Sequence, residues 1–127
     1  MMIKVIFILK GKSFSYQFLA SWTKLLQECP DYGVDWQTVF DTLGDKVKTK
    51  YDYLMWIDQN SVFEPEQFKA LLEKMKNNPQ IGVLAARSLK KGSSNLGFTL
   101  IRKGVTDLQP LVDPEVVIGY EKTVIWR

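Results

Sequence analysis

The segment 51–68, which reads YDYLMWIDQNSVFEPEQF, decides the fold. Its apolar run 53–57 predicts a strand that is buried inside a sheet and ends at Asp58. Pro65 suits the first position of a helix, and Phe63 and Phe68 stand where a hydrophobic staple would fix the start of that helix. The segment therefore predicts a buried strand, a short polar loop and a helix in direct succession.

Similar units stand on both sides of this segment. Residues 3–9 form an apolar, β-branched run that only Lys4 interrupts, as expected for a strand buried on both faces of a sheet. A helix is predicted over 14–29, with Ser13 as its N-cap, and a third strand is predicted over 81–86. This alternation predicts an α/β fold, namely a three-layer sandwich whose mostly parallel central sheet carries helices on both faces.

Other parts of the sequence are less regular. Between residues 33 and 50 the apolar positions fit a helix and a short strand equally well, so both alternatives stay open. A strand is expected over 97–102, and the segments 115–118 and 122–126 could pair as a hairpin. Because no linker or internal repeat divides the 127 residues, we expect one domain over 1–127.

The composition removes several classes of function. The 17 Lys and Arg residues exceed the 14 Asp and Glu residues by only three, and they are spread along the chain, so no nucleic-acid partner is expected. The absence of His excludes Ser-His-Asp and Cys-His nucleophile systems, and the single Cys29 excludes an internal disulfide. The apolar start is too short to span a membrane and lacks a cleavage site, so a cytoplasmic protein without a membrane span is expected.

Candidate binding residues follow two of the predicted strands, where open α/β sheets bind their ligands. Lys10, Gly11 and Lys12 follow the first strand and would attract an anion, although a capped helix with solvated lysines is the favoured explanation. A complete phosphate-binding P-loop is excluded, because Ile6 stands where its first glycine is required.

Asp58 and Asn60 follow the second strand. Oxygen ligands at this spacing suit Mg²⁺ or Mn²⁺, which bridge to diphosphates. The alternative is an Asx turn, in which one of these side chains binds the local backbone and caps the helix that follows.

The segment 51–68 resembles the DxD-bearing segment of GT-A glycosyltransferases, the nucleotide-diphospho-sugar transferase family, in which a strand ends in Asp-x-Asp before a helix opened by Pro. Residues 3–29 suit the nucleotide-binding start of that family, and 97–105 resembles one of its later strands. The resemblance implies a GT-A-like domain that binds a nucleotide-diphosphate sugar. Lys10, Gly11 and Lys12 would lie near the base, and Asp58 and Asn60 would lie near the diphosphate and its Mn²⁺ or Mg²⁺.

The sequence also departs from that family. Asn60 replaces the second aspartate, which weakens metal binding because an amide oxygen is neutral. The chain is short, which implies a domain truncated on its C-terminal, acceptor-binding side. No clear counterpart of the catalytic base is present; the available carboxylates are Asp113, Glu115 and Glu121.

Two functions therefore stay open. One is a glycosyltransferase that moves a sugar from a nucleotide-diphosphate sugar to an acceptor. The other is a non-catalytic module that binds a nucleotide or a protein partner, with the apolar end 124–126 forming a homo-oligomer interface or contacting a partner chain. A receiver-like regulator is disfavoured, because Ile8-Leu9-Lys10-Gly11 offers no acidic pair beside the first strand.

Overall fold

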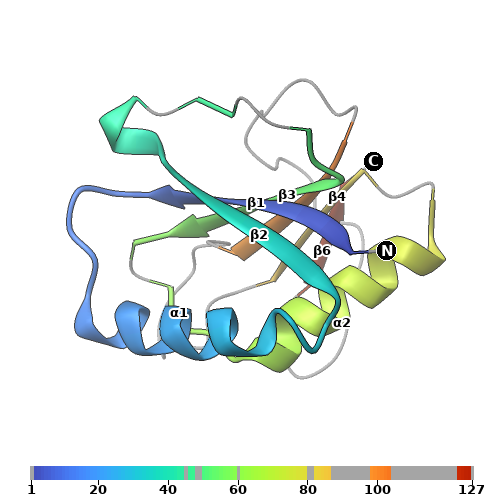
Figure 1. Cartoon of the computed structure of the whole chain (residues 1–127), viewed down its shortest axis with the longest axis horizontal. Helices are drawn as coiled ribbons and strands as arrows, with labels where there is room; N and C mark the ends of the chain where they lie inside the picture. Colours follow the sequence, from blue (N-terminus) through green and yellow to red (C-terminus); the bar gives the residue numbers. More distant parts are fainter. Residues whose placement is uncertain are drawn as a thin grey trace.

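A computed structural model describes residues 2–44, 46–47, 50–59, 61–79, 82–86, 98–103 and 123–126. In this part of the chain six strands and two α-helices are joined by loops and one short 3₁₀ turn (Figure 1). The elements are β1 (Ile3–Lys10), α1 (Tyr16–Glu28), β2 (Val34–Phe40), η1 (Asp41–Leu43), β3 (Tyr53–Asp58), α2 (Pro65–Asn77), β4 (Val83–Ala86), β5 (Phe98–Arg102) and β6 (Thr123–Trp126). The ambiguous region after residue 33 is therefore a strand followed by one 3₁₀ turn.

The six strands form one mixed sheet in the order β2-β1-β3-β5-β4-β6. Strand β1 lies at the centre of its parallel part and pairs with both β2 and β3. Strand β5 is antiparallel to its two neighbours, β3 and β4, and β6 is antiparallel to β4. The carboxyl ends of β1, β2 and β3 consequently meet at the same edge of the sheet.

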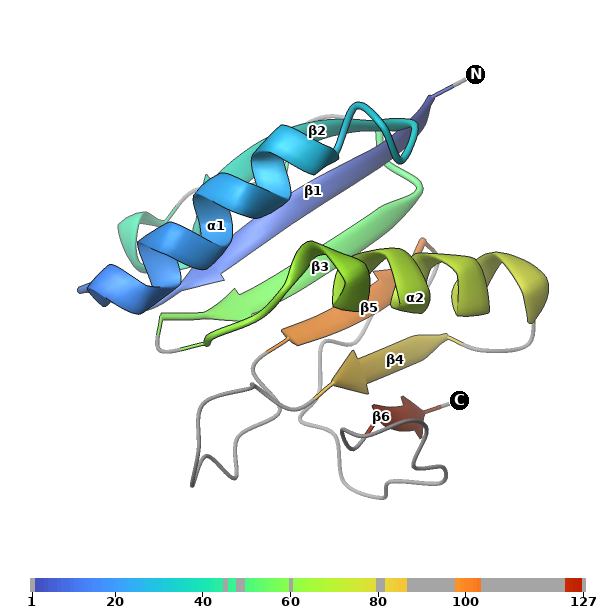
Figure 2. The same cartoon turned by 90° about the horizontal axis from the view of Figure 1, so that it is seen from below.

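Both helices cover the same face of this sheet (Figure 2). The main core fills the space between them and the sheet, where Phe7 of β1 meets residues of α1 and α2 such as Phe18 and Phe68. The predicted three-layer sandwich, with helices on both faces of a mostly parallel sheet, is wrong for the described part of the chain. The structure there has two layers, and three of its five strand pairs are antiparallel.

The error has a physical cause that the face without helices shows. Ile6 and Ile8 are buried there, so the inference that β1 is buried on both faces holds. Val47 and Tyr51, from the segment between η1 and β3, pack against this second cluster in place of a helix. An apolar run in the sequence indicates that both faces of a strand are buried, but it does not indicate which element buries each face.

The antiparallel placement of β5 follows from the length of its connection to β4. Parallel neighbours need a crossover of about a dozen residues or more, usually with a helix, whereas antiparallel neighbours can be joined by a short loop. The connection from Ala86 to Phe98 is shorter than such a crossover. Strand β5 therefore runs back beside β4, with Ala86 in register with Phe98.

The helix starts are set by local hydrogen bonds. The N-cap of α1 is Ser15, whose Oγ accepts the Phe18 N–H at 3.0 Å, so the prediction of Ser13 as cap is wrong by two residues. The prediction for α2 is confirmed, with Pro65 in its first turn. The Gln67 side chain accepts the Glu64 N–H at 2.8 Å and so satisfies one donor that the helix leaves free.

Cys29 gives a test of this core. Its side chain is fully buried at the end of α1, and burial raises the pKa of its thiol to about 12. Between about pH 9 and pH 12 the unfolded chain therefore loses the thiol proton while the folded chain keeps it, so this group's contribution to stability falls as pH rises through that range. At pH 8, alkylation of Cys29 should be far slower than in urea-unfolded protein, as mass spectrometry can follow. Equal rates would contradict the buried position.

Candidate ligand site at the carboxyl edge of the sheet

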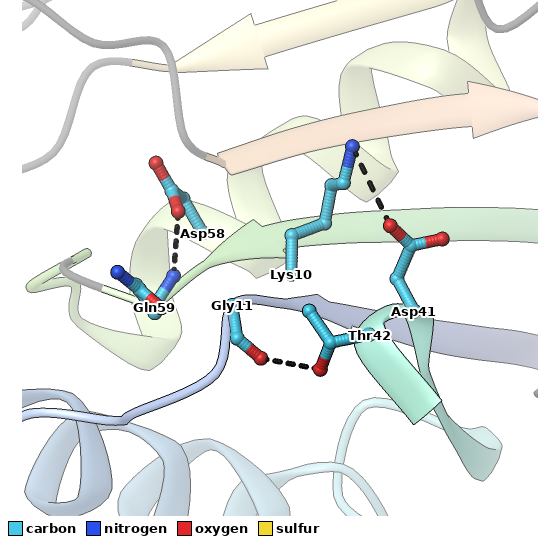
Figure 3. Close-up of polar contacts among 6 residues, drawn as sticks. All are labelled: Lys10, Gly11, Asp41, Thr42, Asp58 and Gln59. Atoms are coloured by element: carbon cyan, nitrogen blue, oxygen red, sulfur yellow. Dashed lines mark hydrogen bonds and ion pairs between the residues drawn. The ribbon is translucent and has the colours of Figure 1, made fainter. Parts of the chain in front are cut away.

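Three charged residues from separate strand ends come together at one edge of the sheet. Lys10 ends β1, Asp58 ends β3, and Asp41 follows β2 directly. Lys10 and Asp58 are in register across the two parallel strands, so their side chains belong to the same face. Figure 3 shows the side chains of all three rising on the same side of the strands. Parallel pairing thus places Lys10 beside Asp58, although many residues separate them in the chain.

The Lys10 ammonium group lies between an acid and an aromatic ring. Its Nζ atom is 3.7 Å from Asp41 Oδ2 and 3.9 Å from the centroid of the Trp56 ring. The Lys10 side chain retains 38% of its exposure and that of Asp41 retains 52%, so solvent screens the pair and it contributes little to stability. The cation is therefore held in position while it stays accessible to a ligand.

Asp58 supplies a half-buried carboxylate. Its Oδ1 accepts the Gln59 N–H at 2.7 Å, the one hydrogen bond that the carboxylate makes within the described residues. The Asp58 carbonyl accepts the Ser61 N–H at 3.0 Å, which closes a turn after β3. The bond from Asp58 Oδ1 reaches the next residue, whereas an Asx turn accepts the N–H two residues on, so it is not an Asx turn. The second carboxylate oxygen has no partner in that part of the structure.

Gln59 joins the loop after β3 to the loop after β1. Its backbone N–H donates to the Lys10 carbonyl at 2.7 Å, and its side-chain Oε1 accepts the Lys12 N–H at 2.8 Å and the Ser13 N–H at 3.4 Å. These two amides are already satisfied, and α1 begins only at Tyr16, so the loop does not present them to a phosphate. This arrangement agrees with the exclusion of a P-loop.

Gly11 makes this connection possible. Its φ of +141° lies in a region that residues with a side chain rarely adopt, and a Cβ atom there would lie 2.0 Å from Gln59 Oε1. The Gly11 carbonyl accepts the Thr42 hydroxyl at 2.7 Å, which ties the turn after β2 to the same loop (Figure 3). Gly11 therefore serves close approach of two loops, and its position does not depend on a phosphate.

The predicted site residues divide into three groups. Lys10, Gly11 and Asp58 lie together at the edge, and Lys12 is exposed just beyond it. Asn60 and the proposed bases Asp113, Glu115 and Glu121 lie outside the described residues. Asp41, Thr42, Trp56 and Gln59 were not predicted from the sequence as site residues; only the sheet order, which places β2 beside β1, could have drawn attention to Asp41.

The described residues contain no group of three or more His, Cys, Asp and Glu side chains that could hold a metal ion. Asp58 offers one carboxylate oxygen without a partner there. Mn²⁺ or Mg²⁺ would need further oxygen ligands, and the diphosphate of a bound nucleotide could supply them. One carboxylate oxygen does not by itself make a metal site.

Comparisons with protein-family models, curated proteins and solved structures give no match. Within the described ranges, no helix has the length and apolar character that crossing a membrane requires. The residues at this edge and the resemblance of segment 51–68 are the features of the chain that bear on function.

Proposed function

We propose that this protein binds a nucleotide-diphosphate sugar at the carboxyl edge of β1, β2 and β3 and transfers the sugar to an acceptor hydroxyl. The observation that carries the proposal is the convergence of Lys10, Asp41, Trp56 and Asp58 at this edge, each from the end of a strand or directly after it. A ligand that combines anionic phosphates with hydroxyl groups matches an accessible cation beside carboxylates. The cytoplasmic location predicted from the sequence is part of the same proposal.

Each residue has a distinct role in this proposal. The Lys10 ammonium group would neutralise the diphosphate, which carries more negative charge as it leaves. Asp58 would accept a hydroxyl hydrogen bond from the ligand or share Mn²⁺ with the diphosphate. In the transfer step the acceptor oxygen forms a bond to the anomeric carbon as the bond from that carbon to the diphosphate oxygen breaks. The hydroxyl proton passes to a carboxylate base, for which Asp113, Glu115 and Glu121 are the candidates.

A second candidate function is nucleotide or partner binding without transfer. Asn60 favours it, because a neutral amide stands at the position where the resemblance places a metal-binding carboxylate. Binding and transfer share the same site, so they are separated by the detection of product.

Binding should depend on the Asp58 carboxylate. We expect Asp58→Asn, which removes one charge and keeps the shape of the side chain, to weaken binding of a nucleotide-diphosphate sugar by about 10-fold, equal to about 1.4 kcal/mol. Calorimetric titration with UDP- and GDP-sugars, with and without Mn²⁺, measures this change.

Asp31→Asn provides the matched control. Asp31 is an exposed carboxylate in the turn that precedes β2, at the opposite edge of the sheet, so its loss should leave the affinity unchanged. The proposal would be contradicted if wild-type protein bound none of the nucleotide-diphosphate sugars, or if Asp58→Asn and wild type bound them with equal affinity. Binding without release of nucleotide diphosphate in the presence of varied acceptors would select the non-catalytic alternative.

A further inference from the structure

The Lys10 ammonium group already has an acid beside it, and this acid competes with any anion that approaches. Lys10 lies between the two acids of the site, because β1 runs between β2 and β3 (Figure 3). Its Nζ atom is 3.7 Å from Asp41 Oδ2, and this ion pair is the one interaction that the Asp41 side chain makes within the described residues. A bound phosphate needs the same ammonium group, so it must displace the Asp41 carboxylate or share the cation with it.

Two hydrogen bonds hold the backbone of Asp41 beside Lys10. Asp41 begins the 3₁₀ turn η1 directly after β2, and its carbonyl accepts the Gly44 N–H at 3.1 Å. The next residue, Thr42, donates its hydroxyl to the Gly11 carbonyl at 2.7 Å, in the loop that follows Lys10. Rotation of its side chain can take the Asp41 carboxylate off the ammonium group, but the negative charge stays at the site.

Asp58 flanks Lys10 on the other side and differs from Asp41 in its partners. In the part of the chain that the structure describes, Asp58 makes no ion pair, and one of its carboxylate oxygens has no hydrogen-bond partner. Asp58 can therefore accept a ligand hydroxyl, whereas Asp41 is already paired with the cation. Although they carry the same charge, the two acids should have opposite effects on the affinity for an anionic ligand.

We infer that Asp41 weakens binding of the nucleoside diphosphate product and so favours its release, an inference that rests on the proposed function. The product carries more negative charge than the nucleotide-diphosphate sugar, because its terminal phosphate no longer bears the sugar and loses a further proton near neutral pH. Asp41 therefore repels the product more strongly than the substrate. The residue discriminates by charge between two ligands that share the same site.

The exposure of the ion pair sets the size of this effect. The side chains of Lys10 and Asp41 are both partly exposed, so water and salt screen their attraction and a ligand can open the pair readily. Release of a lysine from such a pair changes affinity by a factor of about 2–5. The more highly charged product should gain the larger part of this factor when the Asp41 charge is removed.

Calorimetric titrations with UDP and UDP-glucose, and with GDP and GDP-mannose, test the inference under the metal conditions in which wild type binds. We expect Asp41→Asn to bind the nucleoside diphosphate about 3- to 5-fold more tightly than wild type does, and its sugar conjugate less than about 2-fold more tightly. Asp35→Asn is the matched control, because Asp35 is an exposed carboxylate near the other end of β2. This equal change of net charge should leave both affinities unchanged. Circular dichroism verifies that both variants are folded.

The possible outcomes separate this inference from the function on which it rests. If wild type binds a nucleotide-diphosphate sugar but Asp41→Asn binds the nucleoside diphosphate equally or more weakly, the inference alone is overturned, because Asp41 then has no influence or contacts the ligand. Equal gains for the nucleoside diphosphate and its sugar conjugate also overturn it, because discrimination by charge is then absent. Wild type that binds no nucleotide-diphosphate sugar overturns the proposed function and this inference with it.

Discussion

Replacement of Phe7 by alanine should lower the free energy of unfolding by about 3–5 kcal/mol. Phe7 is fully buried in β1, and its ring contacts Trp22 of α1 at 5.0 Å and Phe68 of α2 at 5.5 Å between centroids. It is thus the ring through which both helices are packed on the central strand. Truncation removes these contacts and leaves a cavity that a sheet residue cannot close by shifting, since β1 is fixed by pairing on both sides.

Thermal and urea unfolding measure this loss. For a chain of this size we expect the melting temperature to fall on the order of 10–20 °C. Leu43→Ala is the control for a large apolar residue, because Leu43 is 74% exposed, and its free energy of unfolding should stay within about 0.5 kcal/mol of wild type. Phe7→Leu keeps most of the side-chain volume and should lose less than Phe7→Ala. A loss below about 1 kcal/mol for Phe7→Ala would contradict the packing of both helices on this ring.

The second large effect is expected at Gly11. Gly11→Ala should cost about 2–4 kcal/mol, from a backbone conformation unsuited to a side chain and from the loss of the two hydrogen bonds that Gln59 accepts. The new methyl group would displace Gln59, which in turn releases the loops that position Lys10 and Asp58. Nucleotide-sugar affinity should therefore fall together with stability.

Alanine variants at two other glycines measure the cost of backbone strain without the cost of a steric collision. Gly33 and Gly44 have φ values of 72° and 73°, and an added Cβ meets nothing within 4 Å at either. Their alanine variants should cost only the strain, about 1–2 kcal/mol. A Cβ atom at Gly11 would also lie 2.3 Å from Gln59 Cβ, so only Gln59→Gly removes the collision; in that background Gly11→Ala should cost about 1–2 kcal/mol less than it does in wild type. If urea unfolding gave strictly additive effects of Gly11→Ala and Gln59→Gly, the contact between these two residues would be disproved.

The sequence was sufficient to predict the positions of the helices and strands that have strong local signals. Strand β1 is an apolar run that only Lys4 interrupts, β3 begins with five apolar residues, and α2 has Pro65 and a staple at its start, so their positions follow from spacing alone. The layers could not be predicted, because Ile6 and Ile8 would be buried equally by a helix or by the segment that carries Val47 and Tyr51. The order of the sheet was also hidden, since β5 enters between two strands that precede it in the chain.

The candidate site was predicted in part for a related reason. Lys10, Gly11 and Asp58 follow the two strands with the clearest signals, so rules for open sheets find them. Asp41 and Thr42 follow β2, whose apolar positions fit a helix and a strand equally well. Their approach to Lys10 and Gly11 depends on the pairing of β2 with β1. The Gln59 side chain has no sequence signal, because a contact made by one amide oxygen with two distant N–H groups leaves no periodic pattern.

The place of β5 in the sheet has a consequence for how the chain folds as it is synthesised. Strands β1, β2 and β3 are complete by residue 58 and pair with one another, whereas α2 packs on α1 and also on β4 and β5, which follow it in the chain. Before residues 98–102 are synthesised, one hydrogen-bonding edge of β3 is unpaired, because its second partner is β5. Strand β4 also lacks β5 as its partner at this stage. Insertion of β5 between them is a late, non-local closure of the kind that slows folding. Until β5 inserts, the nascent chain carries the side chains of Lys10, Asp41, Trp56 and Asp58 close to the unpaired edge of β3. Such an edge can pair with another chain and start aggregation.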